Sequence, residues 1–193
     1  ALGLLGYLVA NSESVGRGLA SLQEYLHVHD EGATAFIASE EDRTVLGYEV
    51  VRPGLQGADQ VTFGALGIAA NVLRGLCGAG FRFHEVSFAY RAPPDVSLFR
   101  RFFAAPVRFD AERSALLFPA HWLAAPVAGA NAYIREIVTE KIRQQIADTP
   151  DVNGERLRRV VRSLVAGGKF TVDDLAAAFA LSRRTLARRL NEQ

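Results

Sequence analysis

The arginines near the end of the chain have the residue type and spacing that most directly indicate a binding chemistry, namely hydrogen bonding and charge neutralisation by guanidinium groups. In residues 182–190, Leu186 and Leu190 stand four apart, so a helix would bury both on one face and turn Arg184 and Arg188 outward. A guanidinium can hydrogen-bond two acceptors on a guanine or neutralise a phosphate. The pattern therefore predicts a helix that presents arginine to nucleic acid, and the alternative is a solvated helix whose arginines keep it soluble.

The segment before this helix supplies the element that would position it. Thr171 and Asp174 resemble a capping box at the start of one helix, and Ser182 can cap the next helix after a turn at residues 180–181. Two short helices joined in this way are typical of a helix–turn–helix, whose second helix enters the major groove of DNA. We therefore expect DNA contacts from the first turn and outer face of the second helix, at Ser182, Arg183, Arg184, Thr185, Ala187 and Arg188.

The distribution of charge agrees with a nucleic-acid partner for the end of the chain. The 193 residues carry a net charge of +1, yet residues 1–150 carry −3 and residues 151–193 carry +4. Such asymmetry is typical of a basic, nucleic-acid-binding tail on a neutral body. A polar turn at residues 148–154 separates the two parts. We therefore predict two domains, residues 1–150 and residues 151–193.

The first domain has the alternating helix and strand patterns of an α+β fold. Apolar residues at helical spacing predict helices, and alternating or short apolar runs between turns predict strands. The expected helices are 2–10, 14–26, 59–77, 95–103 and 131–147, and the expected strands are 33–39, 44–51, 84–90, 107–109 and 115–118. We expect helices around an antiparallel sheet of four or five strands, with two hairpins, 33–51 and 107–118, followed by the all-α helix–turn–helix segment.

Several other chemistries are excluded by the sequence. One cysteine, Cys77, cannot form an internal disulfide, and the pair His27 and His29 lacks a third ligand at motif spacing, so we predict no metal site. No nucleophile elbow, phosphate-binding loop or dinucleotide motif occurs, so we predict no cofactor and no enzyme activity. No uninterrupted apolar run reaches the length of a membrane span, and we expect a cytoplasmic protein.

The predicted helix–turn–helix resembles a known family. Residues 175–190, above all Ala176 and the run 181–186, are similar to the first helix–turn–helix of AraC/XylS-type transcription regulators. The body resembles the arabinose-binding-like effector domain of the subgroup that senses amino acids and similar metabolites. That second resemblance rests on residues 86–88, 91–93, 102–103, 106–109 and 117–118, with Leu123. A tyrosine stands at position 90, where the family often has histidine.

The resemblance implies a partner, a ligand and a longer protein. It implies binding to promoter DNA, control by a small-molecule effector such as an amino acid or related metabolite, and a homodimer. Family members carry a second helix–turn–helix, and this chain contains no Met, so we expect a fragment that starts within the effector domain and stops after the first unit. The alternative function is a stand-alone small-molecule sensor whose terminal helices contact other proteins.

An effector pocket is expected between the sheet and the helices, because ligand sites combine apolar and aromatic walls with a few polar groups. The residues that we predict to line it are aromatic or polar side chains on the strands and after the last strand: Tyr48, His84, Phe88, Tyr90 and Trp122. The alternative for each of them is a place in the hydrophobic core.

Overall fold

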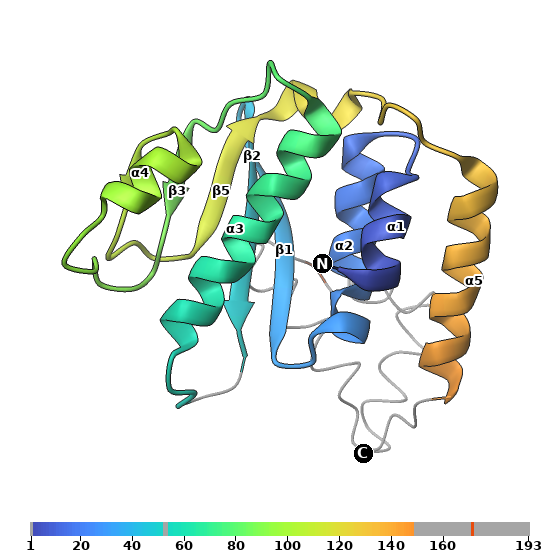
Figure 1. Cartoon of the computed structure of the whole chain (residues 1–193), viewed down its shortest axis with the longest axis horizontal. Helices are drawn as coiled ribbons and strands as arrows, with labels where there is room; N and C mark the ends of the chain where they lie inside the picture. The colour runs from blue at the N-terminus through green and yellow to red at the C-terminus, as the bar shows by residue number, and fades with distance from the viewer. Residues whose placement is uncertain (1, 52–53, 149–170, 172–193) are drawn as a thin grey trace. The chain divides into compact units, whose positions relative to one another are not determined.

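Five strands form one sheet, and helices cover one of its faces (Figure 1). The computed structural model describes residues 2–51, 54–148 and 171, almost all within the first of the chain's two units, Ala1–Pro150. The strand order is β1-β2-β5-β3-β4. The expected α+β class with a sheet of four or five strands is confirmed for this part of the chain. The helix–turn–helix predicted for residues 171–190, with its six DNA-contacting residues, lies outside the described residues apart from Thr171.

The first two strands form the hairpin that the sequence predicts. β1 (Ala33–Glu40) pairs antiparallel with β2 (Arg43–Val50) through a tight turn in which Glu41 has a φ of +54°. The register places Ala35 opposite Tyr48 and Ile37 opposite Leu46. Since side chains alternate across a strand, these four lie on the same face of the sheet. All four belong to or pack against the hydrophobic core on the helical side.

The second predicted hairpin, residues 107–118, is wrong. β4 (Val107–Arg108) and β5 (Ala115–Pro119) are not neighbours, because β3 (Glu85–Ser87) lies between them and pairs antiparallel with β5 and parallel with β4. The chain leaves β3, passes through α4 (Ser97–Phe103) and returns in the same direction, as parallel pairing requires. β3 is also shorter than the predicted strand 84–90.

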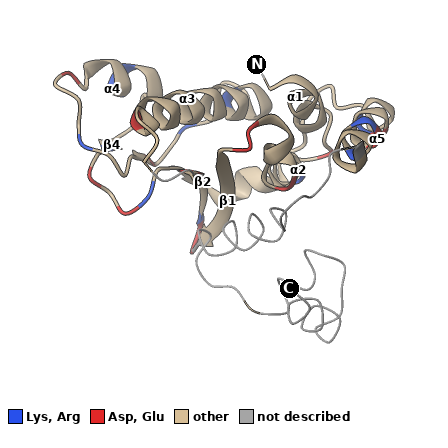
Figure 2. Cartoon of the chain, turned by 90° about the horizontal axis from the view of Figure 1, so that it is seen from below, with Lys and Arg blue, Asp and Glu red and all other residues tan. Residues whose placement is uncertain are grey.

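The helical layer consists of α3 over the sheet and a group of helices beside β1. α3 (Ala58–Cys77) crosses the sheet, and the view in Figure 2 places β1 and β2 beneath it. Leu66, Ala70 and Leu73 are buried and lie on the face of α3 that packs on the core. Among the described residues, α3 is the one helix that is long and apolar enough to cross a membrane. Helices in protein cores can have the same length and composition, so this is weak evidence for a membrane span. α1 (Gly3–Ala10) and α2 (Val15–His29) pack together beyond β1.

Phenylalanines fill the core between α3, α4 and the last strands. Phe63, Phe88, Phe99 and Phe109 lie within 6.2 Å of one another, ring centre to ring centre, mostly edge to face. Such pairs add to the stabilisation that comes from burying the rings. Arg74 of α3 then fixes the end of α4, since its Nη2 donates to the carbonyls of Phe102 and Phe103 at 2.6 and 3.0 Å. The short helix α4 is thereby held against α3.

An arginine of the last described helix, α5 (Ala132–Asp148), links this helix to α1 and α2, in addition to the apolar packing of Val138 and Ile142. η1 (Ala120–Ala124), a 3-10 helix, precedes it in the chain. Arg135 is partly buried and donates from Nη1 to the hydroxyl of Ser12 and from Nη2 to the hydroxyl of Ser21 at 3.2 Å. Ser12 is fully buried and itself donates to the carbonyl of Leu8 at 2.9 Å. A charged donor therefore joins three helices through buried hydroxyls.

On the other face of the sheet, a phenylalanine depends on a glycine. The register places Phe36 of β1 opposite Gly47 of β2. A Cβ built at Gly47 would overlap the ring of Phe36, which is 2% exposed. The ring thus occupies the space that any other side chain at position 47 would need. Glycine at position 47 is therefore required by close packing and not by an unusual backbone angle.

We expect Gly47→Ala to lower the free energy of unfolding by about 1–3 kcal/mol, because overpacked cores force side chains or backbone to move. In a Phe36→Ala background the same change should cost much less, which a double-mutant cycle by urea denaturation would measure. Gly64→Ala in α3 is the control, since a Cβ there meets nothing within 4 Å and should stabilise the helix by roughly 0.5–1 kcal/mol. Equal costs in both backgrounds would contradict the packing explanation.

We expect Arg135→Ala to lower the free energy of unfolding by about 1–3 kcal/mol, because it removes a charged donor from the hydroxyls of Ser12 and Ser21. Lys141→Ala, on an exposed position of the same helix, should change stability by less than about 0.5 kcal/mol. Thermal and urea denaturation of the two variants would compare these costs. Equal losses would show that α5 is not held by this arginine.

Candidate ligand-binding cavity

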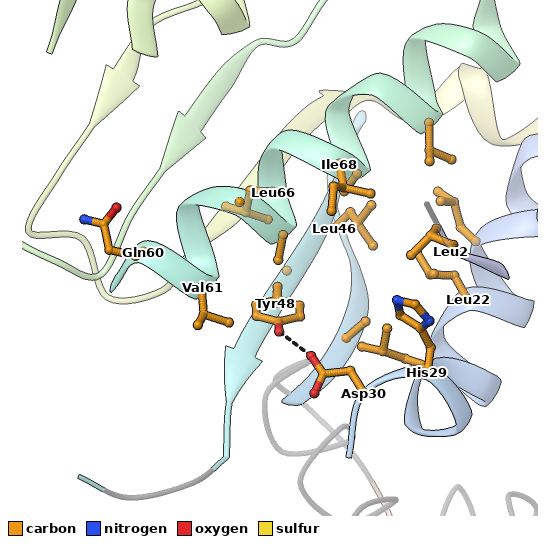
Figure 3. A pocket seen from close by; sticks show the side chains of 18 residues that line it. Leu2, Leu22, His29, Asp30, Leu46, Tyr48, Gln60, Val61, Leu66 and Ile68 are labelled. Carbon is orange, nitrogen blue, oxygen red and sulfur yellow. Dashed lines mark hydrogen bonds between the residues drawn. The ribbon is translucent and has the colours of Figure 1, made fainter. Parts of the chain in front are cut away.

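A cavity of about 310 Å³ lies between α2, α3 and the first two strands (Figure 3). Its floor is formed by β1 and β2, one wall by α2 and the other by α3. The lining residues are mainly aliphatic, namely Leu2, Leu19, Leu22, Leu26, Ala35, Leu46, Val61, Ala65, Leu66, Ile68, Ala69 and Val72, with Gly47, Gly64, His29, Asp30, Tyr48 and Gln60. The volume is at the lower end of the range for small-molecule sites.

Small residues on α3 help to keep this space open. Gly64, Ala65 and Ala69 line the cavity on one side of α3. A Cβ at Gly64 would meet nothing within 4 Å, so that position could hold a larger side chain without a clash. A glycine inside a helix costs about 0.5–1 kcal/mol relative to alanine. The helix therefore sacrifices some intrinsic stability at a position where it borders the cavity.

One polar pair lies at an end of the cavity where β2 approaches the end of α2. The Tyr48 hydroxyl donates to Asp30 Oδ2 at 2.7 Å, and Asp30 Oδ1 accepts the backbone N–H of Gly32 at 2.9 Å (Figure 3). His29 lies beside Asp30 with its side chain at the α2 wall, and Gln60 points away from the pair. Burial, and then the hydrogen bond and charge of Asp30, raise the pKa of Tyr48 well above its usual value. Tyr48 therefore stays neutral and keeps its proton directed at the carboxylate.

Of the five residues predicted to bind an effector, Tyr48 lines the cavity and the other four lie elsewhere. Phe88 is fully buried in the phenylalanine core, and Trp122 packs on the ring of Phe81 at 5.6 Å. Tyr90 lies against Phe63, with its hydroxyl 3.5 Å from that of Thr62. His84 is exposed at the start of β3. The structure does not bring these five side chains together, and their role in effector binding stays a prediction.

Sequence reasoning missed the residues that shape the cavity. Asp30 is the residue directly after α2, and no motif in the sequence marks it as part of a site. The α3 wall holds three small residues, Gly64, Ala65 and Ala69, and the i, i+4 spacing of Ala65 and Ala69 is the signal that could have shown a hollowed wall.

The described residues contain no cluster of three or more histidine, cysteine or acidic side chains that could hold a metal ion. His27 and His29 both lie on α2, where residues two apart point in different directions around the helix. On a strand, two histidines at this spacing would point to the same side and could share a ligand. On α2 their side chains point in different directions, so the pair does not form such a site. Burial raises the pKa of the Cys77 thiol to about 11, so this thiol is a poor nucleophile at neutral pH.

We expect the stability of the chain to fall as pH rises above about 10, in part through Tyr48. The unfolded chain releases this phenolic proton near the usual pKa of 10.0, whereas the folded chain retains it, so unfolding is favoured as pH rises. Tyr48→Phe should make that fall shallower and should cost about 1 kcal/mol at pH 7 through the lost hydrogen bond. Urea denaturation from pH 7 to 11 would measure both effects. Tyr7→Phe, at an exposed tyrosine, should leave stability at pH 7 unchanged, and an unaltered pH slope in Tyr48→Phe would contradict the prediction.

Comparison with known proteins places this domain in a family. Residues 1–127 match the model of the arabinose-binding domain of AraC transcription regulator, N-terminal. The HTH-type transcriptional regulator VirS of Mycobacterium tuberculosis, in strains CDC 1551 / Oshkosh and ATCC 25618 / H37Rv, is 26% identical over 194 residues. That match covers 98% of this chain and 57% of the relative, so the chain spans little more than half the length of the curated relatives it matches.

A solved structure shows the same fold. The crystal structure of the transcriptional regulator CdpR from Pseudomonas aeruginosa has a TM-score of 0.64, with 16% sequence identity, over 99% of this chain and 63% of that chain. The sequence identity is too low for this likeness to carry more than the fold. The family model, in contrast, covers about two thirds of the chain. The chain therefore belongs to the AraC family of transcription regulators, and residues 1–127 are its arabinose-binding-type N-terminal domain.

Proposed function

We propose that this chain is part of a cytoplasmic, dimeric regulator whose DNA binding is controlled by a small molecule. The cavity between α2, α3 and β2 would bind the effector, and residues 151–193 would contribute a helix–turn–helix that contacts promoter DNA. The observation that carries the proposal is the cavity itself, an apolar space with one polar pair inside the N-terminal domain of a transcription-regulator family. The basic charge of residues 151–193 supports the DNA contact.

The position of α2 suggests how the two functions could be coupled. Leu19, Leu22 and Leu26 face the cavity, whereas Ser21, on the opposite side of the same helix, accepts a hydrogen bond from Arg135 of α5. α5 is the last described helix before residues 151–193. A small shift of α2 on ligand binding would therefore move the polar contact that holds α5. Such coupling requires that the effector binds the DNA-competent and DNA-incompetent states with different affinities.

We expect Arg184→Ala and Arg188→Ala, made in the full-length protein, each to weaken binding to the promoter DNA of its own gene. An arginine that contacts a phosphate should also lower the slope of log affinity against log salt by about 1, and one that reads a base should cost about 1–3 kcal/mol. A fluorescence anisotropy titration at several salt concentrations would measure both quantities.

Arg101→Ala, at an exposed position of α4, is the control and should leave DNA affinity unchanged. Circular dichroism and thermal melting should show that all three variants fold as the wild type does. Unchanged affinity and an unchanged salt slope in both helix–turn–helix variants would contradict the DNA-binding role and would favour the stand-alone sensor.

A further inference from the structure

The lining of the cavity restricts the body of its ligand. Twelve of the eighteen lining residues are aliphatic, and two more are glycines. Placing a polar or charged ligand body against such walls would strip its water without giving hydrogen bonds in return. An aliphatic body, in contrast, gains from leaving water in proportion to the apolar area that it buries. The walls of α2 and α3 therefore favour a ligand whose main part is aliphatic.

The polar end of the cavity restricts the head group of the ligand. The Asp30 carboxylate accepts two hydrogen bonds, from Gly32 N–H and from the Tyr48 hydroxyl, whereas a carboxylate offers about four acceptor positions. The Tyr48 hydroxyl uses its proton on Asp30, so its oxygen is left as an acceptor. This end of the cavity therefore offers acceptors to a ligand and carries negative charge.

Among the described residues that line the cavity, a carboxylate ligand would lack a lysine or arginine partner. No lysine or arginine is among the residues that line the cavity in the described part of the chain. The remaining polar lining groups are the exposed side chains of His29 and Gln60. A ligand carboxylate near Asp30 would bring two like charges together in partly apolar surroundings, which is unfavourable. A free amino acid would meet this repulsion through its own carboxylate.

We propose that the cavity binds a small aliphatic molecule with a hydrogen-bond-donating head group at Asp30 and Tyr48, a primary amine in preference to an alcohol, and excludes free carboxylates. The proposal rests on the proposed function, since it names the ligand class of the same effector cavity. An ammonium group donates three hydrogen bonds and is attracted by the Asp30 carboxylate, whereas a hydroxyl donates one and carries no charge.

The test compares three probes that share an eight-carbon chain and differ in the head group. Isothermal titration calorimetry of the 193-residue chain at pH 8 would measure 1-octylamine, 1-octanol and octanoate, with leucine as a free amino acid. Octylamine should bind most tightly, octanol more weakly, and octanoate and leucine should show no saturable binding. Asp30→Asn should lower the preference for octylamine over octanol by about tenfold or more, since it removes the charge and keeps an acceptor for Tyr48.

Matched variants of α3 show whether the probes bind in the cavity. Gly64→Leu adds a branched side chain at an exposed position that lines the cavity, and should abolish saturable binding of octylamine by occupying part of that space. Gly75→Leu adds the same side chain to the same helix at an exposed position that does not line the cavity, and should bind as the wild type does. Thermal melting checks that each variant unfolds cooperatively. If Gly64→Leu does not, Ala65→Leu, which also fills the cavity, takes its place.

Three results would overturn the proposal. Saturable binding of octanoate or leucine that Gly64→Leu abolishes would refute the ligand class and leave the effector cavity standing. Equal binding of octylamine to wild type and to the cavity-filling variant would show association outside the cavity. Absence of binding by both octylamine and octanol would refute the inference itself. The salt titration of Arg184→Ala and Arg188→Ala judges the DNA-binding role independently of all three results.

Discussion

The hydrogen bond from Tyr48 to Asp30 connects the second strand to the end of α2, and the geometry of the cavity depends on this connection. The same carboxylate accepts the N–H of Gly32, so one side chain holds a helix end, the turn that follows it and a strand residue. The bond is partly buried, where lower polarity strengthens it relative to a bond in water. The helix that forms one wall is thereby fixed to the strand that forms the floor by a polar contact, in a region otherwise lined by apolar groups.

The elements that sequence could predict are those set by neighbours along the chain. The hairpin of β1 and β2 follows from two alternating runs around a short polar turn, and helix α3 follows from apolar residues at helical spacing. The place of β4 could not be predicted in the same way. Its partner is β3, about twenty residues earlier, and the parallel pairing depends on where α4 packs and not on the turn at residues 110–113. Packing partners of this kind leave little trace in local periodicity.

The candidate site was predictable only in part, from aromatic and polar residues on the strands. Tyr48 is predicted because aromatic and polar groups converge where ligand pockets form between a sheet and its helices, and it lines the cavity. Phe88 is predicted on the same ground and lies in the core, since aromatic residues in sheets pack against one another as readily as against a ligand. Asp30 could not be found from sequence, because an aspartate at a helix end is explained by capping and turn formation alone.

The glycine and alanines on the cavity side of α3 have an evolutionary consequence. Ala69 packs against the hydrophobic core, whereas Gly64 and Ala65 do not, so these two positions can change size without disturbing the sheet, the phenylalanine core or the contacts of α5. Single substitutions there would shorten or reshape the space by one or two methyl groups at a time, and a change from Gly64 would also strengthen the helix. Substitutions on one face of this helix could thus change the size of the molecule that relatives of this domain bind. The fold of the domain would stay the same.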